Sequence, residues 1–278
     1  MMNNLSQPAQ EKALEKEKCL EKMLKGINSA VIAYSGGVDS TYLLYAAAEV
    51  IGSNKLLAIT VASELTTPDE AENAKQIAET MKVAHRRLDI NLLSDPELRN
   101  NSPQRCYICK KHIYGALLRL AGEGGYETVL DGSNADDTAE YRPGLRALRE
   151  LKVASPLLEA GLGKQEIRYL SRQAGLPTWD RPAAACLASR FPYGEELNPE
   201  GLQNIAAAEK ILRQLGVGTN LRVRSHGNLA RIEVDWADAD LLLGQKDAVV
   251  EKLRELGFIY VTLDLGGFQS GSMDRTLG

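Results

Sequence analysis

Short apolar runs alternate with amphipathic stretches along the first two thirds of the chain. The apolar runs predict strands at residues 30–34, 56–61, 83–90 and 128–130, and the pattern continues with a further run at 152–156. The stretches between them predict helices at about 38–51, from 67 onwards, at 109–120 and at 164–174. A further amphipathic helix is predicted before the first strand from the spacing of Leu20, Met23, Leu24 and Ile27. Strands that alternate with helices predict an α/β fold, with a parallel sheet covered by helices on both faces.

The pattern changes after Pro177. Residues 178–198 are rich in Pro, Ala and Gly, which is typical of a loop. Beyond them the periodicity predicts helices at 199–215, 237–243 and 246–256, and strands at 221–224, 230–234 and 258–263. This part is a smaller α+β domain, so we expect two domains, at 1–178 and 179–278.

The composition is that of an ordinary globular chain. Of its 278 residues, 44% are hydrophobic and 25% are charged, and the formal net charge is −4. An acidic chain is a poor electrostatic partner for bulk nucleic acid, so we expect no stable nucleic-acid complex. No apolar run approaches the ~20 residues of a membrane-spanning helix, and the first residues lack the apolar core of a signal peptide. We therefore expect a cytoplasmic protein with no membrane partner.

The first strand runs into a glycine-containing loop, Ser35-Gly36-Gly37-Val38-Asp39-Ser40, and then into a helix. Two glycines allow a tight turn and the close approach of a ligand. The helix N-terminus offers unpaired N–H groups and a positive dipole end, which suit phosphate. Ser35 and Ser40 add hydroxyl donors, and Asp39 is a candidate ligand for Mg²⁺. The Gly-Lys-Ser/Thr ending of the Walker motif is absent, so this loop does not predict transfer of a γ-phosphoryl group.

The chain has four cysteines, which are too few for a disulfide scaffold. Cys106 and Cys109 form a CxxC pair that suits metal ligation, an iron–sulfur cluster or a redox dithiol. With Cys186 they make three cysteines without an obvious fourth ligand, which suits a [4Fe–4S] cluster with one open iron. Structural zinc would need His112 as its fourth ligand. Cys19 falls on the first amphipathic helix, where we expect it to be buried as a packing residue.

The glycine-containing loop resembles the SGGxDS signature of the PP-loop ATP pyrophosphatases, which cleave ATP between the α- and β-phosphates and adenylate a substrate. DGSNADD after the fourth strand, and the later helix that opens at Lys164, resemble other parts of that superfamily, over about residues 1–178. The whole chain resembles the LarE family of ATP-dependent sulfurtransferases. The strings that carry this second resemblance are SGGVDS, RCYICK, DGSNADD, RPAAACLASRFPYG, LRVRSHGNLARIEV and VTLDLGGFQSGSMD.

The resemblance to LarE implies a reaction and its participants. With ATP and Mg²⁺, a carboxylate of pyridinium-3,5-biscarboxylic acid mononucleotide is adenylated and then receives sulfur as a thiocarboxylate. Two such conversions serve the biosynthesis of the nickel-pincer nucleotide, the lactate racemase cofactor. In one branch of the family, three cysteines matching Cys106, Cys109 and Cys186 hold a [4Fe–4S] cluster that is loaded from a sulfide source. In the other branch the cysteine matching Cys186 gives up its own sulfur. Family members are homo-oligomers, so we expect one here.

The resemblance also implies ligands on both predicted domains, the first for ATP and the second for sulfur transfer and substrate. Asn134 and Asp136 of the DGSNADD string are expected to bind adenosine groups or metal. Arg222 and Arg224 alternate on a predicted strand, so both face one side. Guanidinium forks match phosphate oxygens, and we predict that this pair holds the mononucleotide phosphate or a phosphate of the activated adduct. Arg190 is a second candidate for a phosphate or a carboxylate.

Three other functions fit parts of the pattern. Iron–sulfur-dependent tRNA thiolation enzymes also combine SGGxDS with a CxxC and a distant cysteine. The acidic balance and the absence of a basic–aromatic platform in this sequence disfavour RNA. A nucleotide sensor with structural zinc would need no catalysis, and an ammonia-dependent synthetase similar to NAD synthetase would give the three cysteines no role.

Overall fold

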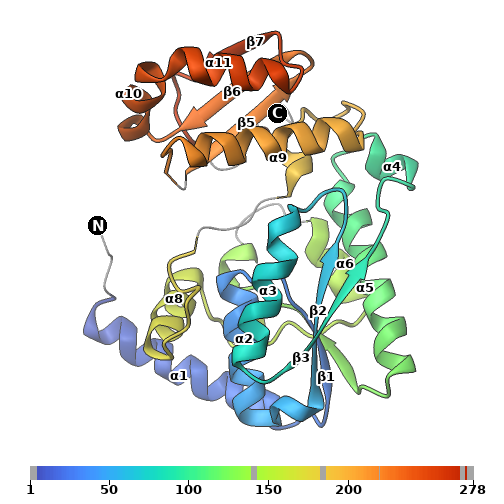
Figure 1. Ribbon diagram of the computed structural model, residues 1–278. Coiled ribbons are helices and arrows are strands. Elements are labelled where there is room, and N and C mark those ends of the chain that lie inside the picture. Colours follow the sequence, from blue (N-terminus) through green and yellow to red (C-terminus); the bar gives the residue numbers. More distant parts are fainter. Residues whose placement is uncertain (1–4, 139–142, 182–185, 219, 270–272, 274–278) are drawn as a thin grey trace. The chain divides into compact units, whose positions relative to one another are not determined.

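The structure, a computed structural model, describes residues 5–138, 143–181, 186–218, 220–269 and 273. The chain forms two compact units (Figure 1). The first comprises Met1–Ser63, Pro68–Ile90 and Cys106–Ala183, and the second comprises Glu64–Thr67, Asn91–Arg105 and Ala184–Gly278.

Two segments from the first half of the chain therefore belong to the second unit, which a single boundary after residue 178 does not include. Backbone hydrogen bonds hold them there. Leu187 N donates to Leu65 O at 3.0 Å, and Leu197 N donates to Arg99 O at 2.7 Å. The stretch that was expected to be only a loop thus pairs with chain from far upstream, and it also contains the short helix η3 (Leu187–Arg190).

The first unit is built on a parallel sheet with the strand order β3-β2-β1-β4. Its strands are β1 (Ala30–Ala33), β2 (Leu56–Ala62), β3 (Ala84–Asp89) and β4 (Thr128–Leu130). The central strand β1 pairs with β2 on one side and β4 on the other, with Ala30 opposite both Leu56 and Thr128. The expected strand at 152–156 contributes only one parallel bridge, between Ala154 and Leu130. The predicted parallel sheet is confirmed.

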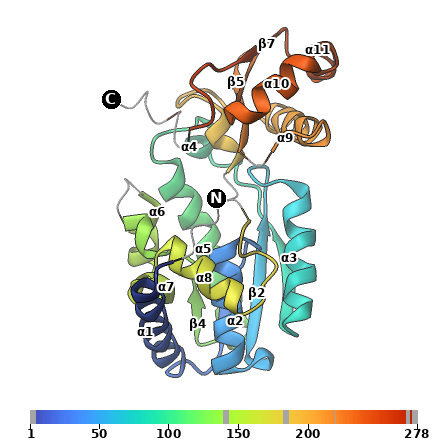
Figure 2. The same cartoon turned by 90° about the vertical axis from the view of Figure 1, so that its left-hand side faces the viewer.

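Helices cover both faces of this sheet (Figures 1 and 2). They are α1 (Gln7–Leu24), α2 (Val38–Ile51), α3 (Pro68–Thr80), α5 (Arg105–Glu123), α6 (Pro143–Glu150), α7 (Pro156–Glu159) and α8 (Lys164–Gln173), with the short helices η1 (Ser53–Lys55) and η2 (Ala135–Thr138). Successive side chains of a strand point to opposite faces. Ala30 and Ile32 of β1 therefore enter an apolar core with α1, α2 and α8, whereas Val31 enters a second core with α5 and α6.

The second unit contains a three-stranded sheet in the order β5-β6-β7. β5 (Leu221–His226) and β6 (Leu229–Val234) form the predicted antiparallel pair, and β7 (Tyr260–Leu263) lies parallel to β6. Its helices are α4 (Pro96–Arg99), α9 (Pro199–Gln214), α10 (Trp236–Gly244) and α11 (Lys246–Glu255). The Asn198 side chain caps α9 by accepting from Gly201 N at 2.8 Å. Within the described ranges, no helix combines the length and the apolar character needed to cross a membrane.

Helix α1 supports the two helices that lie beside the glycine-containing loop. Leu20 and Leu24 are fully buried. Polar contacts also fix how α1 is oriented on the unit. Glu17 accepts a hydrogen bond from the Tyr42 hydroxyl of α2 at 2.7 Å. Lys16 lies 2.6 Å from Glu166 of α8. The expectation that Cys19 is buried is wrong, because this residue lies on the exposed side of α1.

Truncating a buried leucine of α1 tests this supporting role. We expect Leu20→Ala to lower the free energy of unfolding by about 2–5 kcal/mol, because it removes a side chain with no solvent exposure and leaves a cavity. Leu14→Ala is the matched control on the same helix, since Leu14 is 41% exposed, and its effect should stay within about 0.5 kcal/mol. Urea unfolding of both variants is the measurement. Equal losses would show that α1 does not pack on the unit in this orientation.

Candidate functional site

The loop between β1 and α2 exposes backbone donors at the end of the central strand. Gly36 has a φ of 72°, in the left-handed region that favours glycine. A Cβ on Gly36 would also lie 3.1 Å from the Cβ of Ala74. Gly37 is the N-cap of α2 and brings no side chain to accept from the first N–H groups of that helix. Those donors and the positive end of the helix dipole are the features that bind phosphate.

The two serines fix the shape of this loop. Their hydroxyl oxygens lie 3.1 Å apart. Ser35 Oγ accepts from Gly37 N at 3.3 Å, and Ser40 Oγ donates to Gly37 O at 3.2 Å. Arg181 donates to Gly36 O at 3.1 Å from outside the loop. The predicted phosphate-binding residues are therefore brought together in one preorganised turn.

The two carboxylate oxygens of Asp39 have different surroundings. Its Oδ2 lies 2.5 Å from the ammonium nitrogen of Lys164, at the start of α8. Among the described residues its buried Oδ1 has no hydrogen-bond partner. Burial raises the pKa of Asp39, and Lys164 opposes part of that rise. An oxygen that is buried, anionic and unpartnered next to a phosphate loop fits a Mg²⁺ ligand by its donor chemistry.

The loop after β4 shapes the start of α8. Asn134 is buried, and its side-chain oxygen accepts from Asp136 N at 2.9 Å. Asp136 Oδ2 in turn accepts from Lys164 N at 2.8 Å. Asp137 accepts from Asn134 N at 2.9 Å. The side chains of Asn134 and Asp136 are thus engaged within the protein, and these contacts fix the segment from which Lys164 reaches Asp39.

The cysteines are divided between the two units. Cys106 and Cys109 lie three residues apart on the first turns of α5, in the first unit, whereas Cys186 precedes η3 in the second. None of these described cysteines is in a disulfide, and Cys106 and Cys186 are exposed. Within the described ranges, no set of three or more His, Cys, Asp and Glu side chains is arranged to hold a metal ion. His112, the fourth ligand that structural zinc would need, therefore belongs to no such set there.

Arg190 holds the segment that carries Cys186. Its Nε and Nη2 donate to the two carboxylate oxygens of Glu209, at 2.9 and 3.1 Å. Its Nη1 donates to Cys186 O at 3.2 Å and to Ser189 Oγ at 3.0 Å. Both Arg190 and Glu209 are buried, and the arginine keeps the pKa of Glu209 low despite the opposing effect of burial. Arg190 therefore joins α9 to the Cys186 turn through a charged, bidentate contact.

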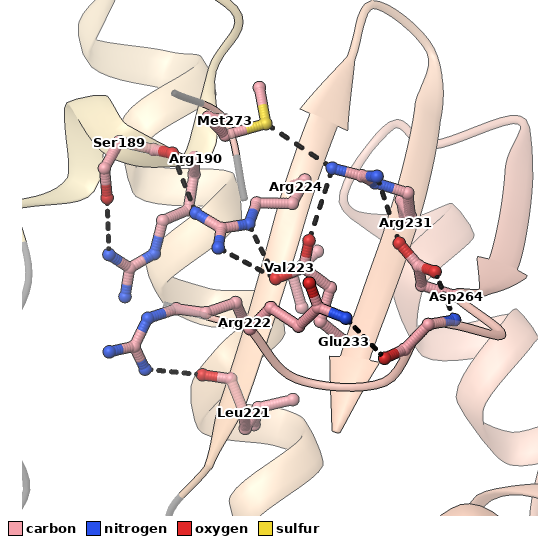
Figure 3. Close-up of polar contacts among 12 residues, drawn as sticks. Ser189, Arg190, Leu221, Arg222, Val223, Arg224, Arg231, Glu233, Asp264 and Met273 are labelled. Carbon is pink, nitrogen blue, oxygen red and sulfur yellow. Dashed lines mark hydrogen bonds and ion pairs between the residues drawn. The ribbon is translucent and has the colours of Figure 1, made fainter. Parts of the chain in front are cut away.

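Arg224 forms an ion pair with a residue of the neighbouring strand. Its Nε and Nη2 donate to Glu233 of β6 at 3.0 and 2.8 Å, and its Nη1 donates to Ser189 O at 2.8 Å (Figure 3). Arg224 is only 4% exposed. The predicted pair of phosphate-binding arginines is thus unequal, because the guanidinium of Arg224 already donates three hydrogen bonds to two protein acceptors.

Arg222 differs from both of these arginines. Its Nη1 donates to its neighbour's carbonyl, Leu221 O, at 2.7 Å, and its guanidinium lies 5.2 Å from the centre of the Phe268 ring. It has no carboxylate ion pair among the described residues. Burial, followed by the neighbouring charge of Arg190, lowers the pKa of Arg222 to about 10.

Figure 3 shows the guanidinium groups of Arg190 and Arg222 directed to the same side of β5. Arg213 also contacts Glu209, at 3.1 Å. The single carboxylate of Glu209 therefore faces three arginines. This local excess of positive charge suits an anion, and Arg222 is the arginine left without a carboxylate of its own in the described part of the chain.

Sequence reasoning missed two groups that the structure brings to the loop. Lys164 was noted only as the start of a helix, although it follows Gly163 at the N-terminus of α8 and pairs with Asp39. Arg181 opens the RPAAACLASRFPYG string but was given no role, since it stands in a loop with no periodic pattern. Both depend on contacts between residues more than 120 positions apart in the chain.

Comparison with known proteins agrees with this site. A family model described as a PP-loop domain matches residues 8–159. An uncharacterised protein of Synechocystis is 43% identical, over 93% of this chain and 96% of its own length. The pyridinium-3,5-bisthiocarboxylic acid mononucleotide synthase of Lactiplantibacillus plantarum is 40% identical, over 94% and 95%. An uncharacterised protein of Methanocaldococcus jannaschii is 31% identical, over 86% and 90%.

The matched region contains the whole parallel sheet and its phosphate loop, and the similarity to the Lactiplantibacillus plantarum synthase continues through the second unit. The chain belongs to the PP-loop family of ATP-utilising enzymes and, within it, to the LarE family of sulfurtransferases.

Proposed function

We propose that this chain is a cytoplasmic, ATP-dependent sulfurtransferase that converts the carboxylates of pyridinium-3,5-biscarboxylic acid mononucleotide into thiocarboxylates. The product would serve the biosynthesis of the nickel-pincer nucleotide, the cofactor of lactate racemase. The observation that carries this proposal is the 40% identity, over nearly the whole of both chains, to a protein named for making that bisthiocarboxylic acid. We also propose a homo-oligomer, for which the exposed apolar residues of the second unit, such as Leu265 and Tyr260, offer surface.

The proposed reaction has two steps. A carboxylate oxygen of the substrate attacks the α-phosphorus of ATP, the bond to the bridging oxygen of the β-phosphate breaks, and pyrophosphate leaves. Sulfide then attacks the acyl carbon of the adenylate, the bond to the AMP oxygen breaks, and AMP leaves. The loop at Ser35–Ser40 supports the first step, because its backbone donors are placed for the phosphates of the leaving pyrophosphate.

Two charged groups of the first unit would serve the same step. Asp39 would hold Mg²⁺ through its unpartnered oxygen, and when bound this ion would neutralise charge on the phosphates. Lys164, which is 28% exposed and held against Asp39, stands where it can turn its ammonium group to the leaving pyrophosphate. Asp39 would thus hold the ammonium group of Lys164 beside the loop before ATP binds.

The second step needs a source of sulfur. Cys106, Cys109 and Cys186 would hold a [4Fe–4S] cluster, which when bound would supply an open iron for sulfide. The support is the donor chemistry of three thiols that are in no disulfide among the described residues, two of them one helical turn apart. The alternative is that Cys186 donates its own sulfur. A tRNA thiolation enzyme is the rival function, and the net charge of −4 disfavours it.

The direct test is the mass of the product. After incubation with ATP, Mg²⁺, sulfide and the biscarboxylate mononucleotide, we expect one oxygen-to-sulfur replacement for each carboxylate, with equal amounts of AMP and pyrophosphate released. The measurement is mass spectrometry of the nucleotide, with tRNA offered in a parallel reaction. Sulfur appearing in tRNA and not in the mononucleotide would overturn the proposed substrate.

Arg222 gives a test of the substrate phosphate. We expect Arg222→Ala to raise the KM for the mononucleotide roughly ten- to hundredfold, which corresponds to the loss of about 1.5–3 kcal/mol from a charge-assisted hydrogen bond. The KM for ATP should stay unchanged. Arg213→Ala is the matched control, since Arg213 contacts the same Glu209 but is 46% exposed at its side chain. With the dephosphorylated pyridinium nucleoside, wild type and Arg222→Ala should have the same KM; a large difference there would contradict phosphate binding.

The cysteines decide between the two sulfur sources. After anaerobic reconstitution, we expect cluster absorbance and bound iron to be lost when Cys106, Cys109 or Cys186 is replaced by Ala. Cys19→Ala should keep both, because Cys19 lies on the exposed side of α1. If Cys106→Ala still makes one thiocarboxylate per chain while Cys186→Ala makes none, sulfur comes from Cys186 and the cluster proposal is wrong.

A further inference from the structure

The CxxC helix α5 is attached to the end of strand β4 by one buried carboxylate. Asp131 follows β4 and is 5% exposed. Its Oδ2 accepts a hydrogen bond from the hydroxyl of Tyr114, which is buried on α5. The same oxygen lies 3.5 Å from the ammonium nitrogen of Lys110, the residue directly after Cys109. Asp131 therefore contacts α5 at two successive turns, beside the cysteine pair.

The other oxygen of Asp131 holds the loop that faces the nucleotide site. Its Oδ1 accepts from Ser133 N at 2.8 Å and from Ser155 Oγ at 3.4 Å. Burial by itself would raise the pKa of Asp131, but Lys110, Ser133 and Tyr114 together hold the pKa below its usual value. The group is thus an anion with partners on both sides, and losing any one partner leaves buried charge less compensated.

The next residue brings this carboxylate against the phosphate loop. A Cβ on Gly132 would lie 3.2 Å from both the Cα and the N of Ser40, so the two backbones touch. On the other side, a Cβ on Gly144 of α6 would lie 3.0 Å from Cδ of Lys110, so the lysine stem is also confined. A continuous path of close contacts therefore runs from Ser40 through Gly132 and Asp131 to Lys110.

We propose that Asp131 is a positioning residue that couples the phosphate loop to the CxxC helix, so that nucleotide binding at the loop changes the accessibility of Cys106 and Cys109. The inference rests on the proposed function only in requiring ATP at the loop. A ligand that fills the space beside Ser40 acts on the Gly132 backbone, and Asp131 passes the displacement to Lys110 and Tyr114. In the enzyme, this would set the cysteine pair in place only when the adenylating site is filled.

Thiol alkylation resolved by residue tests the coupling. The full chain, freed of iron, supplied with Mg²⁺ and kept reduced with a phosphine, is treated with iodoacetamide with and without α,β-methylene-ATP, and each cysteine is followed by mass spectrometry. In the wild type we expect the nucleotide to change the rates at Cys106 and Cys109 about fivefold or more, the lower end of ordinary coupling between sites. The rate at Cys19 on α1 should not change, which provides an internal control.

Asp131→Asn keeps the shape of the side chain but removes its charge. We expect this variant to bind the nucleotide with a similar Kd and to lose most of the nucleotide effect on the two thiols. Tyr114→Phe removes only the hydroxyl and should weaken the effect in the same direction, which keeps the test available if Asp131→Asn does not fold. Glu150→Gln is the control, because Glu150 contacts the same helix through Lys111 and the Tyr107 hydroxyl, both at 2.7 Å, and not through the Asp131 contacts. It should behave as wild type.

The outcomes separate the two proposals. Nucleotide binding with no change in thiol rates in the wild type would overturn the coupling and leave the proposed function standing. A nucleotide effect that persists in both Asp131→Asn and Tyr114→Phe would overturn the role of Asp131. Failure of the wild type to bind the nucleotide at all would overturn the proposed function and the coupling together.

Discussion

The position of β1 at the centre of the parallel sheet is the constraint on which the rest of the first unit depends. β1 is hydrogen-bonded on one side to β2 and on the other to β4, and parallel pairing places the carboxyl ends of all three at one edge. Loops that follow these ends must therefore converge. Ser35–Ser40 follows β1 and Asp131 follows β4, which is why Gly132 touches Ser40 although about ninety residues separate them in the chain.

Buried or half-buried carboxylates fix cations within each of the two units. Asp39 holds Lys164, Asp131 holds Lys110, Glu209 holds Arg190 and Glu233 holds Arg224. Removing one member of a fully buried pair of this kind costs roughly 3–5 kcal/mol, because the remaining charge stays desolvated. The two fully buried pairs, Arg190–Glu209 and Arg224–Glu233, therefore act as rigid fixtures, whereas the partly exposed Lys164 and Lys110 can move. Arg222 lacks such a carboxylate in the described part of the chain, which suits a role in binding an anionic ligand.

The sequence predicted those features that depend on neighbours along the chain. The strand, the SGGVDS turn and the following helix are local, and the structure has them where the pattern placed them. Features that depend on contacts between residues far apart in the chain could not be predicted from the sequence pattern. Cys19 lies one position before Leu20, and so about 100° around the helix from it, which was enough to turn it to solvent. Arg224, for example, is held in an ion pair by Glu233, which lies on another strand.

The residues proposed to act in the reaction come from both units, with Cys106 and Cys109 in the first and Cys186 in the second. Adenylation needs the phosphate loop of the first unit, whereas the candidate substrate phosphate ligand, Arg222, lies in the second. A cluster held by Cys106, Cys109 and Cys186 would take two ligands from one unit and one from the other. Asp131 lies where the adenylating loop meets the helix of the cysteine pair, so it can relate the state of the first step to the geometry of the second.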